Sequence, residues 1–447
     1  MNSLSHRGIG PARLSSLAGP ALSFMMLVMS ALVAADVEAQ PSTPDRAIQL
    51  QQRRLLRNPY DAASYHRLGE AYIQKGRESG DMSYFDLAEQ SLRKSIDLAP
   101  TNAGAVRHLA FVFSSRHDFE QAVVQATRAL ELDPSDGDAY GVLGDALLEL
   151  GKYDEADTAF RRMLEIKRDL SSYARRSGLE TLHGNPDRSI ATLERAIEVG
   201  RANGQPRESI AWAEWQLGEE YFAVGDLKAA ASSYRRAGAT YPGYYRAHSG
   251  LARVRAAQGR YPEAIDLYRK AMGVIPLPEY AVALGDLFTK IGRSADARQQ
   301  YELVEYMARL NALNRTLYNR ELVYFYADRG VKLPEALELA RREIEVRKDI
   351  YGYDALAWAL YRSGRADEAY APMQQALRLG TRDARLFYHA GMIAAQLGKT
   401  AEAITHLERA LATNSNFHVL HADVARATLE ELRSSTRSAG GEKDRDG

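Results

Sequence analysis

One stretch decides the fold: residues 136–166 read DGDAYGVLGDALLELGKYDEADTAFRRMLEI. Its apolar residues recur with helical spacing in two segments, which are separated by the turn LGKY at 150–153. The first segment carries a small residue at Gly144 and the second carries one at Ala156, so the two helix backbones can approach closely. Phe160 supplies bulk for the gap between neighbouring units. The stretch therefore predicts a helical hairpin.

The same hairpin pattern recurs along most of the chain. The small residue of the second helix is found at Ala88, Ala122, Ala156, Ser189, Ala230, Ala264, Ala297, Ala336, Ala369 and Ala403. The successive intervals are 34, 34, 33, 41, 34, 33, 39, 33 and 34 residues. Proline ends several units, as at Pro134 and Pro242, because it cannot donate the next backbone hydrogen bond. Since one hairpin cannot bury both of its apolar faces alone, we predict that the units stack into a solenoid.

These spacings resemble those of the tetratricopeptide repeat, over about residues 58–416 and in ten units. The resemblance implies an all-α fold, a right-handed superhelical solenoid of helix-turn-helix repeats, and a role in binding a protein or peptide partner. The two long intervals divide the array near residues 200 and 310. The expected parts are a linker and first helix entry at 40–57, four repeats at 58–200 with an insertion near 78–86, three repeats at 207–306, three repeats at 307–416, a capping helix at 417–433 and a disordered tail at 434–447.

The N-terminus has the pattern of a secretory signal peptide. Arg7 and Arg13 precede the apolar run 17–35, and the small residues around Ala39 offer a cleavage point. We therefore expect residues 1–39 to be removed and the protein to be periplasmic or secreted, with no membrane contact afterwards. A permanent N-terminal anchor is the alternative, although the apolar run is short for a spanning helix.

Composition and motifs argue against catalysis and against nucleic-acid binding. Lys plus Arg and Asp plus Glu both total 58, so the formal net charge is zero and long-range attraction to nucleic acid is not expected. The absence of cysteine excludes disulfides and thiol chemistry. The sequence has no Gly-rich phosphate loop, no nucleophile elbow and no His-Glu-x-x-His motif. We expect neither an enzyme nor a cofactor, and the oligomeric state stays open.

The resemblance places the first helix of each unit on the concave surface, where a partner would bind. The candidate partner-binding residues at these positions are Arg107, Phe111, Trp212, Trp215, Arg253, Asp354, Trp358, Tyr361, Tyr388 and His389. Asp138, Asp145, Phe222, Arg246, Tyr351 and Arg385 hold further positions of this kind. Exposed Trp, Tyr and Arg are typical anchors of partners. Two alternatives remain: the rings pack between first helices, or the surface stacks on sugars and the chain is a glycan or small-ligand receptor.

A third alternative is metal handling near the C-terminus. His418 and His421 are three residues apart, which places them on one helical face, and His406 lies on the preceding helix. Two imidazoles at this spacing can share a transition metal if a third ligand completes the site. Ordinary semi-buried histidines of a capping helix have the same pattern.

Overall fold

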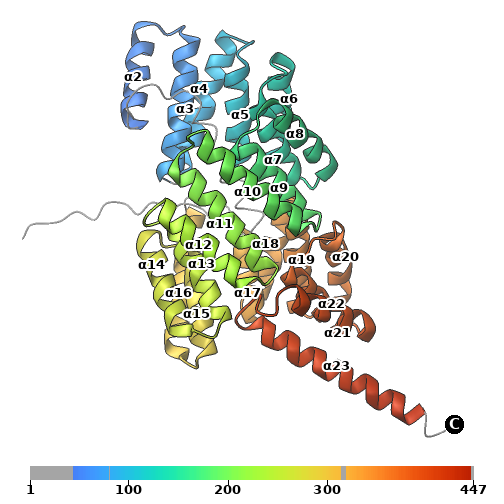
Figure 1. Ribbon diagram of the computed structural model, residues 1–447. Coiled ribbons are helices and arrows are strands. Elements are labelled where there is room, and N and C mark those ends of the chain that lie inside the picture. The colour runs from blue at the N-terminus through green and yellow to red at the C-terminus, as the bar shows by residue number, and fades with distance from the viewer. Residues whose placement is uncertain (1–43, 80, 314–318, 444–447) are drawn as a thin grey trace, which may run out of the picture.

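The computed structural model describes residues 44–79, 81–313 and 319–443, and every regular element in these ranges is an α-helix (Figure 1). The helices are α2 (Pro44–Arg57), α3 (Ala62–Ser79), α4 (Ser83–Leu98), α5 (Ala103–Ser115), α6 (Phe119–Leu132), α7 (Gly137–Glu149), α8 (Tyr153–Ile166), α9 (Leu170–Leu182), α10 (Pro186–Ala202), α11 (Arg207–Ala223), α12 (Leu227–Thr240), α13 (Tyr245–Ala257), α14 (Tyr261–Val274), α15 (Pro278–Lys290), α16 (Ser294–Leu313), α17 (Asn319–Arg329), α18 (Leu333–Val346), α19 (Ile350–Arg362), α20 (Ala366–Leu377), α21 (Ala384–Gln396), α22 (Thr400–Thr413) and α23 (His421–Lys443).

The helices from α3 to α22 form ten consecutive hairpins, and each hairpin packs on the next. Helix α2 covers α3 at one end, and α23 packs on α22 at the other. The predicted all-α solenoid of ten units is therefore confirmed. The expected signal peptide at 1–39 lies outside the described residues. Among the helices described, none combines the length and the apolar character that crossing a membrane requires.

Glycines set the spacing within and between the hairpins. A Cβ atom on Gly144 would lie 2.2 Å from the ring of Phe160, and one on Gly285 would lie 2.2 Å from the ring of Tyr301. The ring of Tyr234 lies against both Gly218 and Gly250 in the same way. These rings occupy the space that the missing side chains leave, as the quoted stretch predicts.

The irregular units extend helices instead of inserting loops. Helix α3 has 18 residues, and α10 and α11 have 17 each, whereas α5 has 13. The insertion expected near 78–86 thus begins as helix, and the extra residues near 200 lengthen the helices on both sides of a turn at Gly204, whose φ is +66°. The long interval near 310 coincides with the 20 residues of α16 and with residues outside the described ranges.

Two boundaries at the ends of the array need correction. Residues 44–57, expected as a linker and first helix entry, already form α2. The final helix begins at His421 and continues to Lys443, so the disordered tail expected from residue 434 is helical for most of its length. The reason is local, because neither proline nor glycine interrupts the chain between His421 and Ala439. Figure 1 shows the end of α23 projecting away from the array.

Units far apart in the sequence also pack on one another. The backbone N–H of Lys348 donates to the carbonyl oxygen of Glu149 at 2.8 Å, and the N–H of Ile350 donates to the hydroxyl oxygen of Tyr153 at 2.8 Å. Further along, Asn414 Nδ2 donates to the carbonyl oxygen of Phe222 at 2.7 Å. The C-terminal hairpins α17–α22 are thus held against the earlier units, and the array closes on itself (Figure 1).

The glycine contacts make a direct prediction for stability. Replacing Gly144 by alanine forces a methyl group into the ring of Phe160, and we expect a loss of about 1–3 kcal/mol in the free energy of unfolding. Gly273 of α14 is the matched control, because a Cβ there meets nothing within 4 Å, so Gly273→Ala should leave stability unchanged or slightly higher. Urea unfolding followed by circular dichroism measures both. Equal stabilities for the two variants would contradict the spacing role.

Candidate functional site

A cavity of about 460 Å³ lies between the central and the C-terminal repeats. One wall comes from the first helices α11, α13 and α15. The opposite wall comes from α17, from the starts of α19 and α21, and from the segment before α23. The cavity depends on the long-range hydrogen bonds that close the array, since they hold these two walls together.

Aromatic side chains form much of the cavity lining. The rings belong to Trp215, Phe222, Tyr268, Tyr280, Tyr324, Phe325, Tyr351 and Phe417. The indole N–H of Trp215 is buried and has no hydrogen-bond partner among the described residues. An apolar lining with a few unsatisfied polar atoms is typical of a binding cavity.

The arginines of the lining are held by rings or by carboxylates. Arg253 pairs with Glu219 and lies 4.1 Å from the ring centre of Phe222. Arg246 lies 4.7 Å from the ring centre of Trp215. Arg320 donates to both carboxylate oxygens of Asp349, at 2.7 and 3.1 Å, and also pairs with Glu343 at 3.1 Å. Arg385 lies 4.4 Å from the ring centre of Tyr324, and its Nε has no partner in the described part of the chain.

Three carboxyl groups of the lining have raised pKa values: Glu220 is buried, and Glu279 and Glu321 are half-buried. Burial raises the pKa of Glu279 to about 8, and the carboxylates of Glu321 and Glu219 add to this rise while Arg246 and Arg253 oppose it. Burial also raises the pKa of Glu321 and raises that of Glu220 to about 7. Within the described ranges, Oε2 of Glu279 and Oε2 of Glu220 accept no hydrogen bond.

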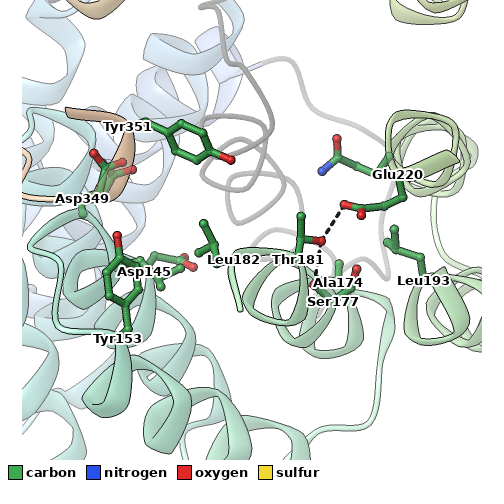
Figure 2. Close-up of a pocket in the computed structure, with 14 residues that line it drawn as sticks. Asp145, Tyr153, Ala174, Ser177, Thr181, Leu182, Leu193, Glu220, Asp349 and Tyr351 are labelled. Carbon is green, nitrogen blue, oxygen red and sulfur yellow. Dashed lines mark hydrogen bonds between the residues drawn. The ribbon is translucent and has the colours of Figure 1, made fainter. Parts of the chain in front are cut away.

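A narrow branch of about 40 Å³ runs from this region towards the N-terminal repeats (Figure 2). It shares Thr181, Glu220 and Tyr351 with the large cavity. Thr181 Oγ1 donates to Glu220 Oε1 at 2.7 Å, one of the dashed lines of Figure 2. Asp145 and Glu149 lie at its far end, where burial raises their pKa values to about 6 and about 7. The branch has room for a few water molecules and not for a larger ligand.

Comparison with known proteins identifies the repeats. Family models described as tetratricopeptide repeat match residues 62–102, 115–176, 215–273 and 355–417. These segments are tetratricopeptide repeats. They cover units one to six, nine and ten in whole or in part, in agreement with the spacing of the small residues.

The tetratricopeptide repeats of this chain also resemble those of curated proteins. A segment of 139 residues, 31% of this chain, is 29% identical to the small glutamine-rich tetratricopeptide repeat-containing protein 2 of Saccharomyces cerevisiae and covers 40% of it. A segment of 158 residues, 34% of this chain, is 27% identical to the type IV pilus assembly protein PilF of Pseudomonas aeruginosa and covers 58% of it. The chain thus spans less than two thirds of either relative. Among solved structures, YrrB, described as a TPR protein with an unusual peptide-binding site, is 22% identical over 43% of this chain and 97% of its own, with a TM-score of 0.31.

Of the residues predicted for the concave surface of the repeats, some line the cavity and others lie elsewhere. Trp215 and Arg253 line the cavity, as do Phe222, Arg246, Tyr351 and Arg385. Arg107 lies elsewhere and donates to both carboxylate oxygens of Asp136, at 3.0 and 3.1 Å. Phe111 and Trp212 are buried outside the cavity. The two cavity residues therefore remain candidates for partner binding.

The predicted residues of the last two repeats form a buried cluster. The ring of Trp358 stacks on that of His389 at 3.9 Å and lies 5.0 Å from that of Tyr361, and Tyr388 packs at its edge. His389 Nδ1 lies 2.9 Å from Asp354 Oδ1. Trp358 is 1% exposed and both His389 and Asp354 are 0% exposed, so the prediction of an accessible binding surface is wrong here. The rings instead fill the gap between first helices, which is the alternative reading of such aromatic positions.

The three histidines predicted for a metal do not converge. The rings of His418 and His421 stack at 4.2 Å, but their Nε2 atoms approach different carboxylates, those of Asp286 and Asp328. His406 lies near Glu402 on α22. A grouping of three ligand atoms within 4.8 Å of one another occurs elsewhere in the described ranges, at His66, Glu70 and His108.

The His66, Glu70 and His108 grouping could not be found from the sequence, because 42 residues separate its two histidines. His66 Nε2 and His108 Nδ1 lie 2.8 Å apart and hydrogen bond directly. Arg107 Nη2 lies 3.4 Å from His108 Nε2, and its positive charge opposes a cation there. Burial lowers the pKa values of both histidines. The grouping therefore fits a neutral hydrogen-bonded pair that joins the first two repeats.

The raised pKa of Glu279 predicts a pH dependence of stability. Between pH 4.5 and about pH 8 the folded protein keeps a proton on Glu279 that the unfolded chain has lost, so the free energy of unfolding falls as the pH rises through this range. Glu279→Gln removes the titratable carboxyl and with it this loss of stability at higher pH. We expect the variant to match the wild type at pH 4.5 and to exceed it by on the order of 3 kcal/mol at pH 8.5.

Thermal melting at the two pH values measures the difference in Tm. Glu302→Gln, at an exposed position on α16, is the control and should show no pH-dependent gain. A gain for Glu279→Gln that is the same at both pH values would contradict the buried protonated carboxyl.

Proposed function

We propose that this tetratricopeptide-repeat chain binds a short segment of a partner protein in the cavity between its central and C-terminal repeats. The observation that carries the proposal is the cavity itself, which joins an aromatic lining to buried polar atoms that have no partner among the described residues. A volume of about 460 Å³ falls in the usual range of ligand sites. It suits a few residues of extended chain, since a helix with its side chains is about 10–12 Å wide.

The unsatisfied polar atoms support the proposal energetically. A buried donor or acceptor without a partner costs about 1–3 kcal/mol. Trp215 Nε1, Arg385 Nε and Glu279 Oε2 all carry this cost in the described part of the chain. A peptide offers both N–H and C=O groups, so it can satisfy donors and acceptors at once. The closed array also holds the anchors in place before binding, which reduces the entropy lost on association.

Filling the cavity tests the proposal. Ala283 lines the cavity, and Ala283→Trp places an indole in the space that the peptide would occupy. In affinity selection from a random tetrapeptide library, read by mass spectrometry, we expect the wild type to enrich a subset of sequences and the variant to lose that enrichment by about tenfold or more. Ala401→Trp, at an exposed position on α22, is the control and should behave as the wild type.

Two results would redirect the assignment. Enrichment that survives in a folded Ala283→Trp variant would contradict the cavity as the binding site. Signal on a glycan array together with no peptide enrichment would favour the alternative of a sugar receptor, because the same rings can stack on sugar faces.

We also propose that the chain is exported and that the mature protein begins at Gln40. The support is the basic, apolar and small-residue order of residues 1–39. Residues 1–45 fused to a leaderless alkaline phosphatase should give active enzyme in a Gram-negative host, and N-terminal sequencing should start at Gln40. Replacing both Met26 and Leu27 by arginine should abolish the activity. An active but uncleaved, membrane-bound fusion would support the anchor alternative.

A further inference from the structure

We propose that the cavity selects a ligand carrying a protonated amine, such as a lysine side chain or a peptide N-terminus, and that Glu279 and Glu321 receive it. The inference rests on the proposed function, because it names the chemistry of the segment that the cavity takes. Glu279 belongs to α15 and Glu321 belongs to α17, so the two carboxyl groups come from neighbouring first helices that line the same cavity.

Three arginines of the cavity lining are already engaged. Arg253 pairs with Glu219, and Arg320 pairs with Asp349 and Glu343. Arg246 lies over Trp215 and donates from Nε to the hydroxyl oxygen of Tyr245 at 3.0 Å. An anionic ligand would have to compete with these interactions. These three arginines therefore offer little to a carboxylate or a phosphate.

Most carboxylates of the lining are also engaged. Asp286 pairs with Arg329 and accepts from Tyr301 Oη at 2.8 Å. Asp328 accepts from Trp358 Nε1 at 2.7 Å. Asp383 accepts from backbone N–H groups at the start of α21, and Glu220 accepts from Thr181.

Glu279 and Glu321 differ from these carboxylates. In the described ranges neither has an ion pair within 4.0 Å. Glu321 accepts a hydrogen bond from its own backbone N–H, and Oε2 of Glu279 is buried without a partner. The two carboxylates repel each other when both are charged, because the charge of Glu321 raises the pKa of Glu279. A cation placed between them would relieve both the missing hydrogen bond and this repulsion.

Aromatic rings around the two carboxyls favour a cation further. Trp215, Tyr280 and Tyr324 line the same cavity, and ring faces attract an ammonium group. Since burial keeps a proton on Glu279 at neutral pH, an arriving ammonium should ionise this carboxyl and release the proton to solvent. Arg246 and Arg253 oppose the rise in the pKa of Glu279, and the carboxylates of Glu321 and Glu219 add to it.

A pair of peptides that differ only in the charge tests the inference. Acetyl-Ala-Lys-Ala-amide carries the ammonium, and acetyl-Ala-norleucine-Ala-amide has the same side-chain length without it. By isothermal titration calorimetry on the full chain at pH 7, we expect the lysine peptide to bind about tenfold more tightly or better. Its binding should release a proton, measured by repeating the titration in buffers of different ionisation enthalpy.

Variants assign the preference to the two carboxyls. The double variant Glu279→Gln with Glu321→Gln should reduce the lysine preference to less than threefold, whereas Glu302→Gln should keep it in full. Where circular dichroism shows that the double variant does not fold, Glu321→Gln alone and the proton release of the wild type provide the test. The preference should fall in that variant.

Three outcomes would overturn the inference. They are equal binding of the two peptides, an unchanged preference in the folded double variant, and binding of neither peptide up to millimolar concentration. Each leaves the proposed function to its own test, because tetrapeptide enrichment that depends on Ala283 does not require a lysine.

Discussion

In units three, five, six and seven, the contact between a glycine of one helix and an aromatic ring of a neighbouring helix sets how closely the helices pack. Tyr234 shows why, since its ring lies against Gly218 in its own hairpin and against Gly250 in the following one. One side chain thereby determines both the angle within a hairpin and the step to its neighbour. Such steps add up along a solenoid, so small local distances decide how far the array curves.

The curvature brings distant units into contact, which a simple solenoid does not require. Arg347 lies at this closure, where it pairs with Glu149 at 3.1 Å and approaches His117 at 2.9 Å. Burying such charges costs solvation energy, so the pair adds little net stability. It does make one relative position of the two surfaces strongly preferred, because a displaced Arg347 would leave a buried charge unpaired. A cavity with fixed walls follows from that constraint.

The periodicity of small residues was enough to predict the ten hairpins, because each hairpin is decided by contacts within about 34 residues. The closure could not be predicted, since no pattern links Tyr153 to Ile350, 197 residues later. For the same reason the sequence could not distinguish Trp215 from Trp358 as a candidate anchor. Trp215 lines the cavity, whereas Trp358 lies in the core. Glu279 was missed because a glutamate near a helix start is usually solvated. Its position on the first helix of the seventh unit was the available signal.

The buried carboxyls connect stability to binding. An unpaired carboxyl in an apolar cavity lowers the stability of the free protein, most of all at a pH where it would be charged. A long array can carry this cost because each hairpin is stabilised mainly by its neighbours, far from the cavity. A ligand that pairs with the carboxyl restores the stability that the unpaired carboxyl removes. Such a ligand binds only the closed array, because only closure forms the cavity. Ligand binding should therefore stabilise the contacts of Glu149 and Phe222 that close the array. Closure of the array and binding of the ligand are then thermodynamically coupled.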